Sequence, residues 1–239
     1  MFLPSLLFLL AAKPKLYTNP KTRSPLIAWY LKELNVAYDE EIVDVSKREN
    51  KSKEFLELNP FGQLPVLQTN GRSIYESGAI LMYLSETYGE LAKSKSALDR
   101  ANISKWVFFA NSSLSSKVTQ GAGRKGSPGW RIAMEPSLNV LEQVLSASKS
   151  GYLIDEIGQL TAADIAVASL LLYTPVFHVG EYGLLKNFRQ VVDYMEFMSE
   201  RPAYREAYDN ERIRVIEDGI AGYRNPSKVK PKGKWGGFF

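Results

Sequence analysis

The chain has 239 residues, 45% of them apolar and 23% charged, so it is long enough for two globular domains and too apolar to be a disordered chain. It contains no cysteine and one histidine, which excludes a disulfide scaffold, a cysteine–histidine zinc site and a catalytic protein thiol. Its net charge of +4 comes from a basic tail, residues 224–239, with five lysines and arginines and no acidic residue, whereas a nucleic-acid-binding fold would carry such charge on a folded face.

The two ends of the chain differ in composition from the rest. Residues 1–13 form an apolar extension, whose apolar run is shorter than the ~20 residues that cross a bilayer, so no membrane span is expected. No basic residue precedes this run as in a signal peptide, although Ala11-Ala12 would suit a cleavage site. We expect a cytoplasmic protein, with secretory or organellar targeting by residues 1–12 left open. The basic tail is expected to be a flexible, solvated appendage.

Residues 14–89 alternate between strand and helix patterns. Strands are expected at 15–18, 37–43, 65–68 and 72–75, and helices at 24–34, 52–58 and 77–88. Asn70-Gly71 between the last two strands is a strong hairpin signal. The order β-α-β-α-β-β-α predicts a small mixed sheet with helices on its faces.

A polar segment without periodicity, residues 90–98, is expected to be a linker. An all-helical domain over 99–223 should follow, because strand patterns disappear. Its helical patterns lie at 98–117, 131–149, 162–173, 187–199 and 202–209. Thr161 and Asp164 form a capping pattern before an apolar run, which predicts a buried central helix.

Two sequence patterns resemble functional sites, but the residues around them do not fit such a site. Gly121, Gly123 and Gly126 have nucleotide-binding spacing, but a helical pattern precedes them where a strand is required. His178 lies in an apolar segment without a nucleophile motif, which indicates a core or helix-end histidine. Neither pattern predicts a catalytic site.

The segments "NPFGQLPVL" (59–67) and "IYESGAILMYL" (74–84) would suit a short peptide that carries a thiol. Leu64-Pro65 is a good candidate for a cis bond that exposes backbone groups at a sheet edge. Ser77, at the start of a helix, would offer a hydroxyl and free amides to a carboxylate. Glu76 would offer a carboxylate to an ammonium group.

These two segments resemble the glutathione-binding half of the glutathione transferase family, nearest to its phi and bacterial-type classes. "KLYTNPKTRSPLIAWYLKELNVAYD" is similar to the family's first strand and helix, and "TAADIAVAS" to its capped core helix. The resemblance implies a thioredoxin-like domain followed by an all-helical domain, glutathione as co-substrate and a homodimer. No metal is expected.

The family's binding residues carry over to matching positions. Leu64 would pair through its backbone with the cysteinyl unit, with Pro65 cis and Gln63 in the same turn. Glu76 and Ser77 would hold the γ-glutamyl end. A basic residue for the glycine carboxylate falls on Lys51, with Lys53 as a substitute and a solvated loop lysine as the alternative.

The thiol-activating position of the family falls on the corner Thr22-Arg23-Ser24. This corner departs from the common serine pattern. The resemblance favours Thr22 as hydrogen-bond donor to the thiolate, Ser24 as a second donor or helix cap, and Arg23 as a source of positive potential. The alternative is that both hydroxyls only cap the helix.

The expected reaction is attack of the glutathione thiolate on an apolar electrophile, as in detoxification. The electrophile would lie between the domains, lined by Trp106, Phe108, Asn111 and Tyr173, and Phe177 is a further candidate. Core packing is the alternative for these aromatic residues. A non-catalytic association module, or a glutathione-dependent peroxidase, isomerase or dehalogenase, stays open.

Overall fold

The computed structural model describes residues 13–94, 96–119, 128–178, 182–183 and 185–225. The expectations for the apolar extension, for the tail beyond residue 225 and for the glycines at 121–126 lie outside these residues. Among the described residues, no helix combines the length and apolar character that crossing a membrane requires.

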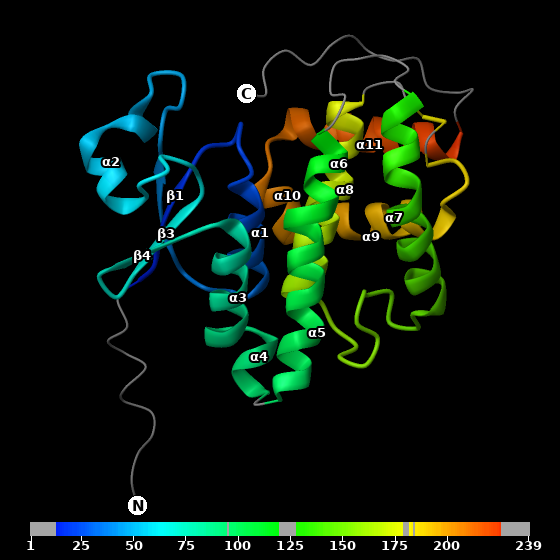
Figure 1. Cartoon of the computed structure of the whole chain (residues 1–239), viewed down its shortest axis with the longest axis horizontal. Helices are drawn as coiled ribbons and strands as arrows, with labels where there is room; N and C mark the ends of the chain where they lie inside the picture. Colours follow the sequence, from blue (N-terminus) through cyan, green and yellow to red (C-terminus); the bar gives the residue numbers. More distant parts are fainter. Residues whose placement is uncertain (1–12, 95, 120–127, 179–181, 184, 226–239) are drawn as a thin grey trace, which may run out of the picture.

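The N-terminal part follows the predicted order of strands and helices (Figure 1). Its elements are β1 (Lys15–Thr18), α1 (Pro25–Glu33), β2 (Asp39–Ile42), the 3-10 helix η2 (Glu49–Lys51), α2 (Lys53–Leu58), β3 (Val66–Thr69), β4 (Arg72–Tyr75) and α3 (Ser77–Thr87). The sheet order is β2-β1-β3-β4, with β1 and β2 parallel and the other neighbours antiparallel. This arrangement confirms the thioredoxin-like βαβαββα domain.

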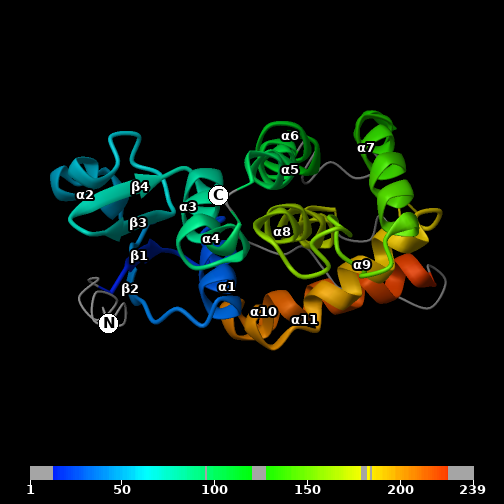
Figure 2. The same cartoon turned by 90° about the horizontal axis from the view of Figure 1, so that it is seen from below.

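The two faces of the sheet pack on different partners because side chains alternate along each strand. Leu16 and Leu67 belong to the large core that continues into the helical part. Tyr17 and Val66 point the other way, into a small cluster with Phe55 of α2. Helices α1 and α3 therefore lie between the sheet and the helical domain, and α2 covers the far face (Figures 1 and 2).

The second part is all helical, as predicted. It contains α5 (Ala97–Phe108), the π-helical turn η3 (Phe109–Leu114), α6 (Ser115–Thr119), α7 (Pro128–Ala147), α8 (Ala162–Phe177), α9 (Arg189–Ser199), α10 (Pro202–Ala207) and α11 (Asn210–Arg224). Helix α8 is buried along nearly its whole length, and the other helices surround it (Figure 2). The capping pair Thr161 and Asp164 forms the predicted capping box at its start.

Two helices were missed by the sequence patterns. The expected linker contains the short helix α4 (Glu90–Lys93), which is too short for a periodic signal but buries Leu91. The sequence patterns do not predict helix α11, because charged residues separate Ile213, Ile216 and Ile220, although these three follow helical spacing. Its Gly219 lies so close to α8 that a Cβ atom there would come 2.2 Å from the Pro175 side chain.

Polar contacts join the two domains on the side of α1. The Glu33 carboxylate accepts hydrogen bonds from Arg201 at 2.5 and 2.7 Å and from the Trp29 ring at 2.9 Å. Glu90 accepts from the Tyr30 hydroxyl at 2.6 Å and from the Ala162 amide at 2.8 Å, at the start of α8. Each of these two carboxylates accepts hydrogen bonds that connect the first domain to the helical domain. Residues of both domains therefore lie close enough to contribute to one site.

Candidate active site

Three segments that carry predicted site residues meet at one end of the sheet. Val66 of β3 pairs with Tyr17 of β1 on one side and with Tyr75 of β4 on the other. The chain after β1, the turn before β3 and the chain after β4 must therefore leave the sheet at the same end. The segments gathered there are the loop 19–24, the turn 59–65 and the start of α3.

The turn before β3 contains the predicted cis bond. The peptide bond between Leu64 and Pro65 is cis. Leu64 is half-buried, and the Gln63 side chain is exposed. Leu64, which is predicted to pair with glutathione through its backbone, thus follows directly on the exposed Gln63 side chain.

The turn is held by a residue that the sequence analysis did not assign. The buried Asn59 side chain donates to the Gln63 carbonyl at 2.8 Å and accepts from the Phe61 amide at 3.1 Å. Gly62 has φ +58°, and a Cβ atom there would lie 2.5 Å from the Asn50 carbonyl oxygen, so only glycine fits. An asparagine before Pro-x-Gly is a turn signal that could have identified Asn59.

Lys51 lies beside this turn, as its predicted role requires. Its ammonium donates to the carbonyls of Phe61 and Gly62 at 2.8 and 3.0 Å. The side chain is exposed, so solvent and ligands reach it. Lys53 is also exposed, on the first turn of α2, and makes no such contact among the bonds of the described residues.

The start of α3 combines an unusual backbone with a buried hydroxyl. Glu76 precedes the helix with φ +68°, a conformation that non-glycine residues seldom adopt, and its side chain is exposed. Ser77 is the first residue of the helix, as predicted, and it is buried. The first amides of an α-helix lack partners within the helix, so this end can hold an anion.

Asn111 connects two of the predicted groups. It lies in the π-helical turn η3, a kind of turn that is frequent at functional sites. Its side-chain oxygen accepts from Ser77 Oγ at 3.1 Å and from Arg23 Nη2 at 2.9 Å. Its amide group donates to the Val107 carbonyl at 3.0 Å. The residue predicted to line the electrophile site therefore links the start of α3 to the loop 19–24.

A chain of hydroxyl groups lies in the loop 19–24. Thr22 is half-buried, and its Oγ1 donates to the Asn19 carbonyl at 2.8 Å. The same atom lies 2.6 Å from Ser24 Oγ and accepts from the Ser24 amide at 3.2 Å. Ser24 is fully buried at the N-cap position of α1 and makes no side-chain capping bond. Thr22 is thus the more accessible hydroxyl, with Ser24 behind it.

Arg23 is held in the space between the domains. Besides Asn111, its guanidinium contacts Ser115 Oγ at 3.4 Å, while its Nε atom is buried without a partner among the described residues. Burial lowers the pKa of Arg23, against the electrostatic influence of Tyr173, Tyr208 and Glu76. An arginine remains charged in proteins, so positive charge lies next to Thr22.

The four predicted electrophile residues do not form one surface. Trp106 is buried and packs edge-to-face on Phe109 with 5.8 Å between ring centroids, whereas Phe108 is exposed, because residues two positions apart on a helix do not face each other. Tyr173 is buried, and its hydroxyl donates to the Thr22 carbonyl at 3.0 Å. Asn111 and Tyr173 therefore adjoin the corner that is predicted to activate the thiol, and Trp106 and Phe108 lie apart from each other.

Arg212 of α11 also reaches this corner and was not predicted. It donates to the Tyr173 hydroxyl at 2.9 Å and to the Pro20 carbonyl. No sequence signal identifies it, since an arginine in a helix rich in charged residues is normally a surface residue.

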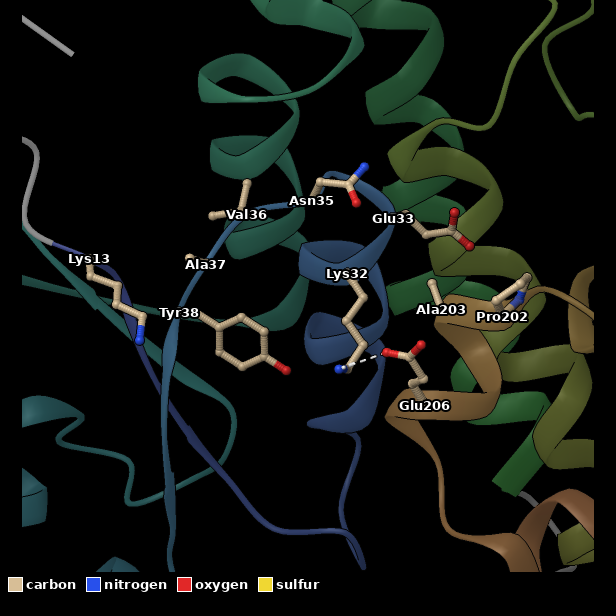
Figure 3. Close-up of a pocket in the computed structure, with 10 residues that line it drawn as sticks. All are labelled: Lys13, Lys32, Glu33, Asn35, Val36, Ala37, Tyr38, Pro202, Ala203 and Glu206. Atoms are coloured by element: carbon tan, nitrogen blue, oxygen red, sulfur yellow. Dashed lines mark hydrogen bonds and ion pairs between the residues drawn. The ribbon is translucent and has the colours of Figure 1, made fainter. Parts of the chain in front are cut away.

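A hollow of about 650 Å³ lies elsewhere, between the connection from α1 to β2 and helix α10 (Figure 3). Its charged groups are mostly paired, with Lys32 3.2 Å from Glu206 and Lys13 2.5 Å from Asp39. It contains none of the predicted site residues. Within the described ranges, no group of three or more histidine, aspartate or glutamate side chains is arranged to hold a metal ion.

Comparisons with known proteins identify the family of the N-terminal part. Residues 12–86 match the sequence model of the family described as "Glutathione S-transferase, N-terminal domain". A glutathione S-transferase of Arabidopsis thaliana is 28% identical over 190 residues, covering 74% of this chain and 87% of that protein. A probable elongation factor 1-gamma of the same plant is 32% identical over 192 residues, which are 77% of this chain but only 45% of that relative.

Solved structures share the fold. The crystal structure of a glutathione transferase from Phanerochaete chrysosporium in complex with oxidized glutathione is 26% identical, with a TM-score of 0.69, and the match covers 85% of this chain and 97% of that one. Residues 12–86 therefore carry the N-terminal domain of the glutathione transferase family, and the chain as a whole shares the fold of that family's solved structures.

Proposed function

We propose that this protein is a glutathione transferase that joins the thiolate of reduced glutathione to small apolar electrophiles. The observation that carries the proposal is the meeting of the loop 19–24, the turn 59–65 and the start of α3 at one end of the sheet. A sheet edge, a helix N-terminus and a hydroxyl are the three features that an extended tripeptide with carboxylates and a thiol requires.

Each part of glutathione has a partner in this proposal. The cysteinyl unit pairs with the backbone of Leu64, beside Gln63. The γ-glutamyl carboxylate takes the Ser77 amide and, when it turns from Asn111, the Ser77 hydroxyl, and the γ-glutamyl ammonium takes the Glu76 carboxylate. The glycine carboxylate takes Lys51, whose ammonium is exposed beside the same turn.

Replacing Ser77 with alanine is expected to weaken glutathione binding by about 1–3 kcal/mol, the range for losing a hydrogen bond to a charged group. Isothermal titration calorimetry would measure the loss. Ser85→Ala is the matched control, because Ser85 is buried on the same helix two turns away. Equal affinities for the two variants would mean that the carboxylate binds elsewhere.

Thiol activation is proposed to use Thr22 supported by Ser24. A free thiol has a pKa of about 8.5, so only a few per cent is ionised at neutral pH unless the site stabilises the anion. When the Thr22 hydroxyl turns from the Asn19 carbonyl to the sulfur, Ser24 can still donate to Thr22 Oγ1 across 2.6 Å. Such a chain polarises the terminal donor, and Arg23 adds positive charge.

The conjugation itself is a nucleophilic substitution. With a chlorinated nitrobenzene, the sulfur attacks the ring carbon that carries chlorine, a C–S bond forms, and chloride leaves with the bonding electrons. The protein contributes ionisation and orientation of the thiol. The same thiolate would serve a peroxidase, isomerase or dehalogenase reaction, so peroxides and halogenated substrates belong in the same assay panel.

A second candidate function is a non-catalytic association module. Similarity to a probable elongation factor 1-gamma over 77% of this chain supports it, as does the unusual Thr-Arg-Ser corner. Retention on glutathione resin followed by the conjugation assay separates the candidates. Retention with turnover supports the transferase, retention alone indicates a binder, and absence of both favours the module.

We also propose a homodimer that uses the exposed side of α5. Leu98 and Phe108 are 70% and 63% exposed, near the two ends of this helix. Exposed large apolar side chains that gather on one side of a protein are a feature of interaction surfaces. The exposure of Phe108 suits an interface better than an enclosed electrophile site.

Phe108→Asp is accordingly expected to convert the dimer into a monomer, because it places a charge in an apolar interface. Light scattering coupled to size-exclusion chromatography would show the apparent mass halve. Phe197→Asp, which alters an exposed aromatic residue on α9, is the control and should leave the mass unchanged. A monomeric wild-type protein would contradict the proposal.

The remaining proposals concern boundaries and location. We propose residues 14–89 as the glutathione-binding domain, 90–98 as a connection that contains α4, and 99–223 as the helical domain. The cytoplasm is the proposed location, which cell fractionation would test.

A further inference from the structure

Arg212 is an arginine buried in the interior of the protein. It is 1% exposed, although it lies in the first turn of α11, a helix rich in charged residues. Its guanidinium lies 5.3 Å from the ring centroids of both Tyr173 and Tyr208, so aromatic faces surround the charge. Burying a guanidinium costs free energy that an apolar residue would avoid, so packing alone does not explain this side chain.

The polar contacts of Arg212 lead to the thiol-activating loop. One guanidinium nitrogen donates to the Pro20 carbonyl directly. Another donates to the Tyr173 hydroxyl at 2.9 Å, and that hydroxyl donates to the Thr22 carbonyl at 3.0 Å. Two carbonyl groups of the loop 19–24 are therefore held from the helical domain, and one of them belongs to Thr22 itself.

Tyr173 is suited to transmit this contact. It lies on the buried helix α8, and burial raises the pKa of its hydroxyl, with Arg212 and Arg23 opposing the rise. The hydroxyl therefore keeps its proton at neutral pH and can accept from Arg212 while it donates to Thr22. Bonds in such a chain polarise one another, so the cation strengthens the bond to the loop.

The described charges around Arg212 add positive potential to the corner. Among the described residues, the charged and titratable groups that face Arg212 include Asp209, Tyr173, Tyr204 and Tyr208, and Arg23 acts on the same Tyr173 and Tyr208. Asp209 is the acid among them, at 3.7 Å and with a side chain that is 42% exposed to solvent. Charges interact over longer distances in a poorly solvated interior than in water, so Arg23 next to Thr22 and Arg212 behind Tyr173 favour an anion there, against the exposed Glu76 that also acts on Arg23.

We infer that Arg212 is a positioning residue for thiol activation, which acts through Tyr173 to hold Thr22 in place and adds positive potential to the site. The inference rests on the proposed function, since it concerns the thiolate of bound glutathione. Under this inference, α11 helps to hold the loop 19–24, although the two segments are far apart in the sequence.

Three variants of the full-length protein test the inference. Arg212→Gln removes the charge, Arg212→Lys keeps it, and Tyr173→Phe removes one hydroxyl oxygen from the connection. Arg201→Gln is the matched control, because Arg201 also binds the two domains together through Glu33 but has no contact with the loop 19–24 among its bonds. The readouts are the apparent pKa of bound glutathione from thiolate absorbance, kcat, KM for glutathione and the melting temperature.

Arg212→Gln is expected to raise the apparent pKa of bound glutathione by about one unit, a tenfold loss of thiolate, and to lower kcat at neutral pH accordingly. KM for glutathione should change little, because the Leu64 and Ser77 contacts persist. Arg212→Lys should recover part of the loss, and Tyr173→Phe should lie between wild type and Arg212→Gln. Arg201→Gln should lower the melting temperature without moving the thiol pKa.

The inference is overturned if Arg212→Gln shifts the thiol pKa no more than Arg201→Gln at a comparable loss of melting temperature. If Arg212→Gln does not fold, Tyr173→Phe decides, and a wild-type thiol pKa and kcat in that variant would refute the connection. A wild-type protein that binds glutathione without lowering its thiol pKa refutes the proposed function instead, and that measurement comes first.

Discussion

Replacing Asp164 with alanine is expected to lower the free energy of unfolding by about 3–5 kcal/mol, because a buried acceptor of several hydrogen bonds disappears. The Asp164 carboxylate accepts from the amides of Leu153 and Thr161 at 2.9 Å, from Thr161 Oγ1 at 2.9 Å and from the Tyr194 hydroxyl at 3.1 Å. All of these donors would remain in a dry interior without their partner. Chemical denaturation followed by circular dichroism would measure the loss.

A second aspartate provides the control for this result. Asp209 caps α11 by accepting from the Arg212 amide at 2.8 Å, but it is exposed, so water replaces it in the alanine variant. Asp209→Ala is expected to cost about 1 kcal/mol, the usual value for a helix cap. Similar losses for both variants would show that the Asp164 network contributes no more than an ordinary cap.

Replacing Thr22 with valine is expected to raise the apparent pKa of bound glutathione by about one to two units, the equivalent of one hydrogen bond to an anion. kcat/KM at neutral pH should fall about 10- to 100-fold in consequence. Ser24→Ala should have a smaller effect, because Ser24 is fully buried and acts through Thr22. Conjugation rates measured across pH would give both values.

The control for Thr22→Val is the same substitution at Thr69, a buried threonine at the other end of β3. Thr69→Val should leave the pH dependence of conjugation unchanged. A larger shift for Ser24→Ala than for Thr22→Val would exchange the roles of the two hydroxyls. Unchanged profiles in both variants would mean that the hydroxyls serve only the start of α1.

Much of the fold was predictable because its signals are local. The hairpin follows from Asn70-Gly71, whose positive φ angles the two-residue turn requires. The capping box at Thr161 lies within four residues, and the cis bond depends on the proline itself. Helix α4 has four residues, about one helical turn, which is too short to show a repeating pattern, and its Glu90 contacts Tyr30 and Ala162, far away in sequence.

The sequence by itself determined the order of the strands and α-helices in the first domain, the two-domain plan and the short motifs that carry the predicted glutathione-binding residues, since a motif is a local pattern. Only the tertiary structure decided that Asn111 joins Ser77 to Arg23, that Trp106 and Phe108 point apart, and that Arg212 reaches the loop 19–24 through Tyr173. The contacts of Asn111 and Arg212 join residues about 30 to 190 positions apart, and they depend on how η3, α8 and α11 pack against the first domain. The spacing of residues along a helix determines which of them share a face. The packing between helices determines which residues of other elements that face contacts.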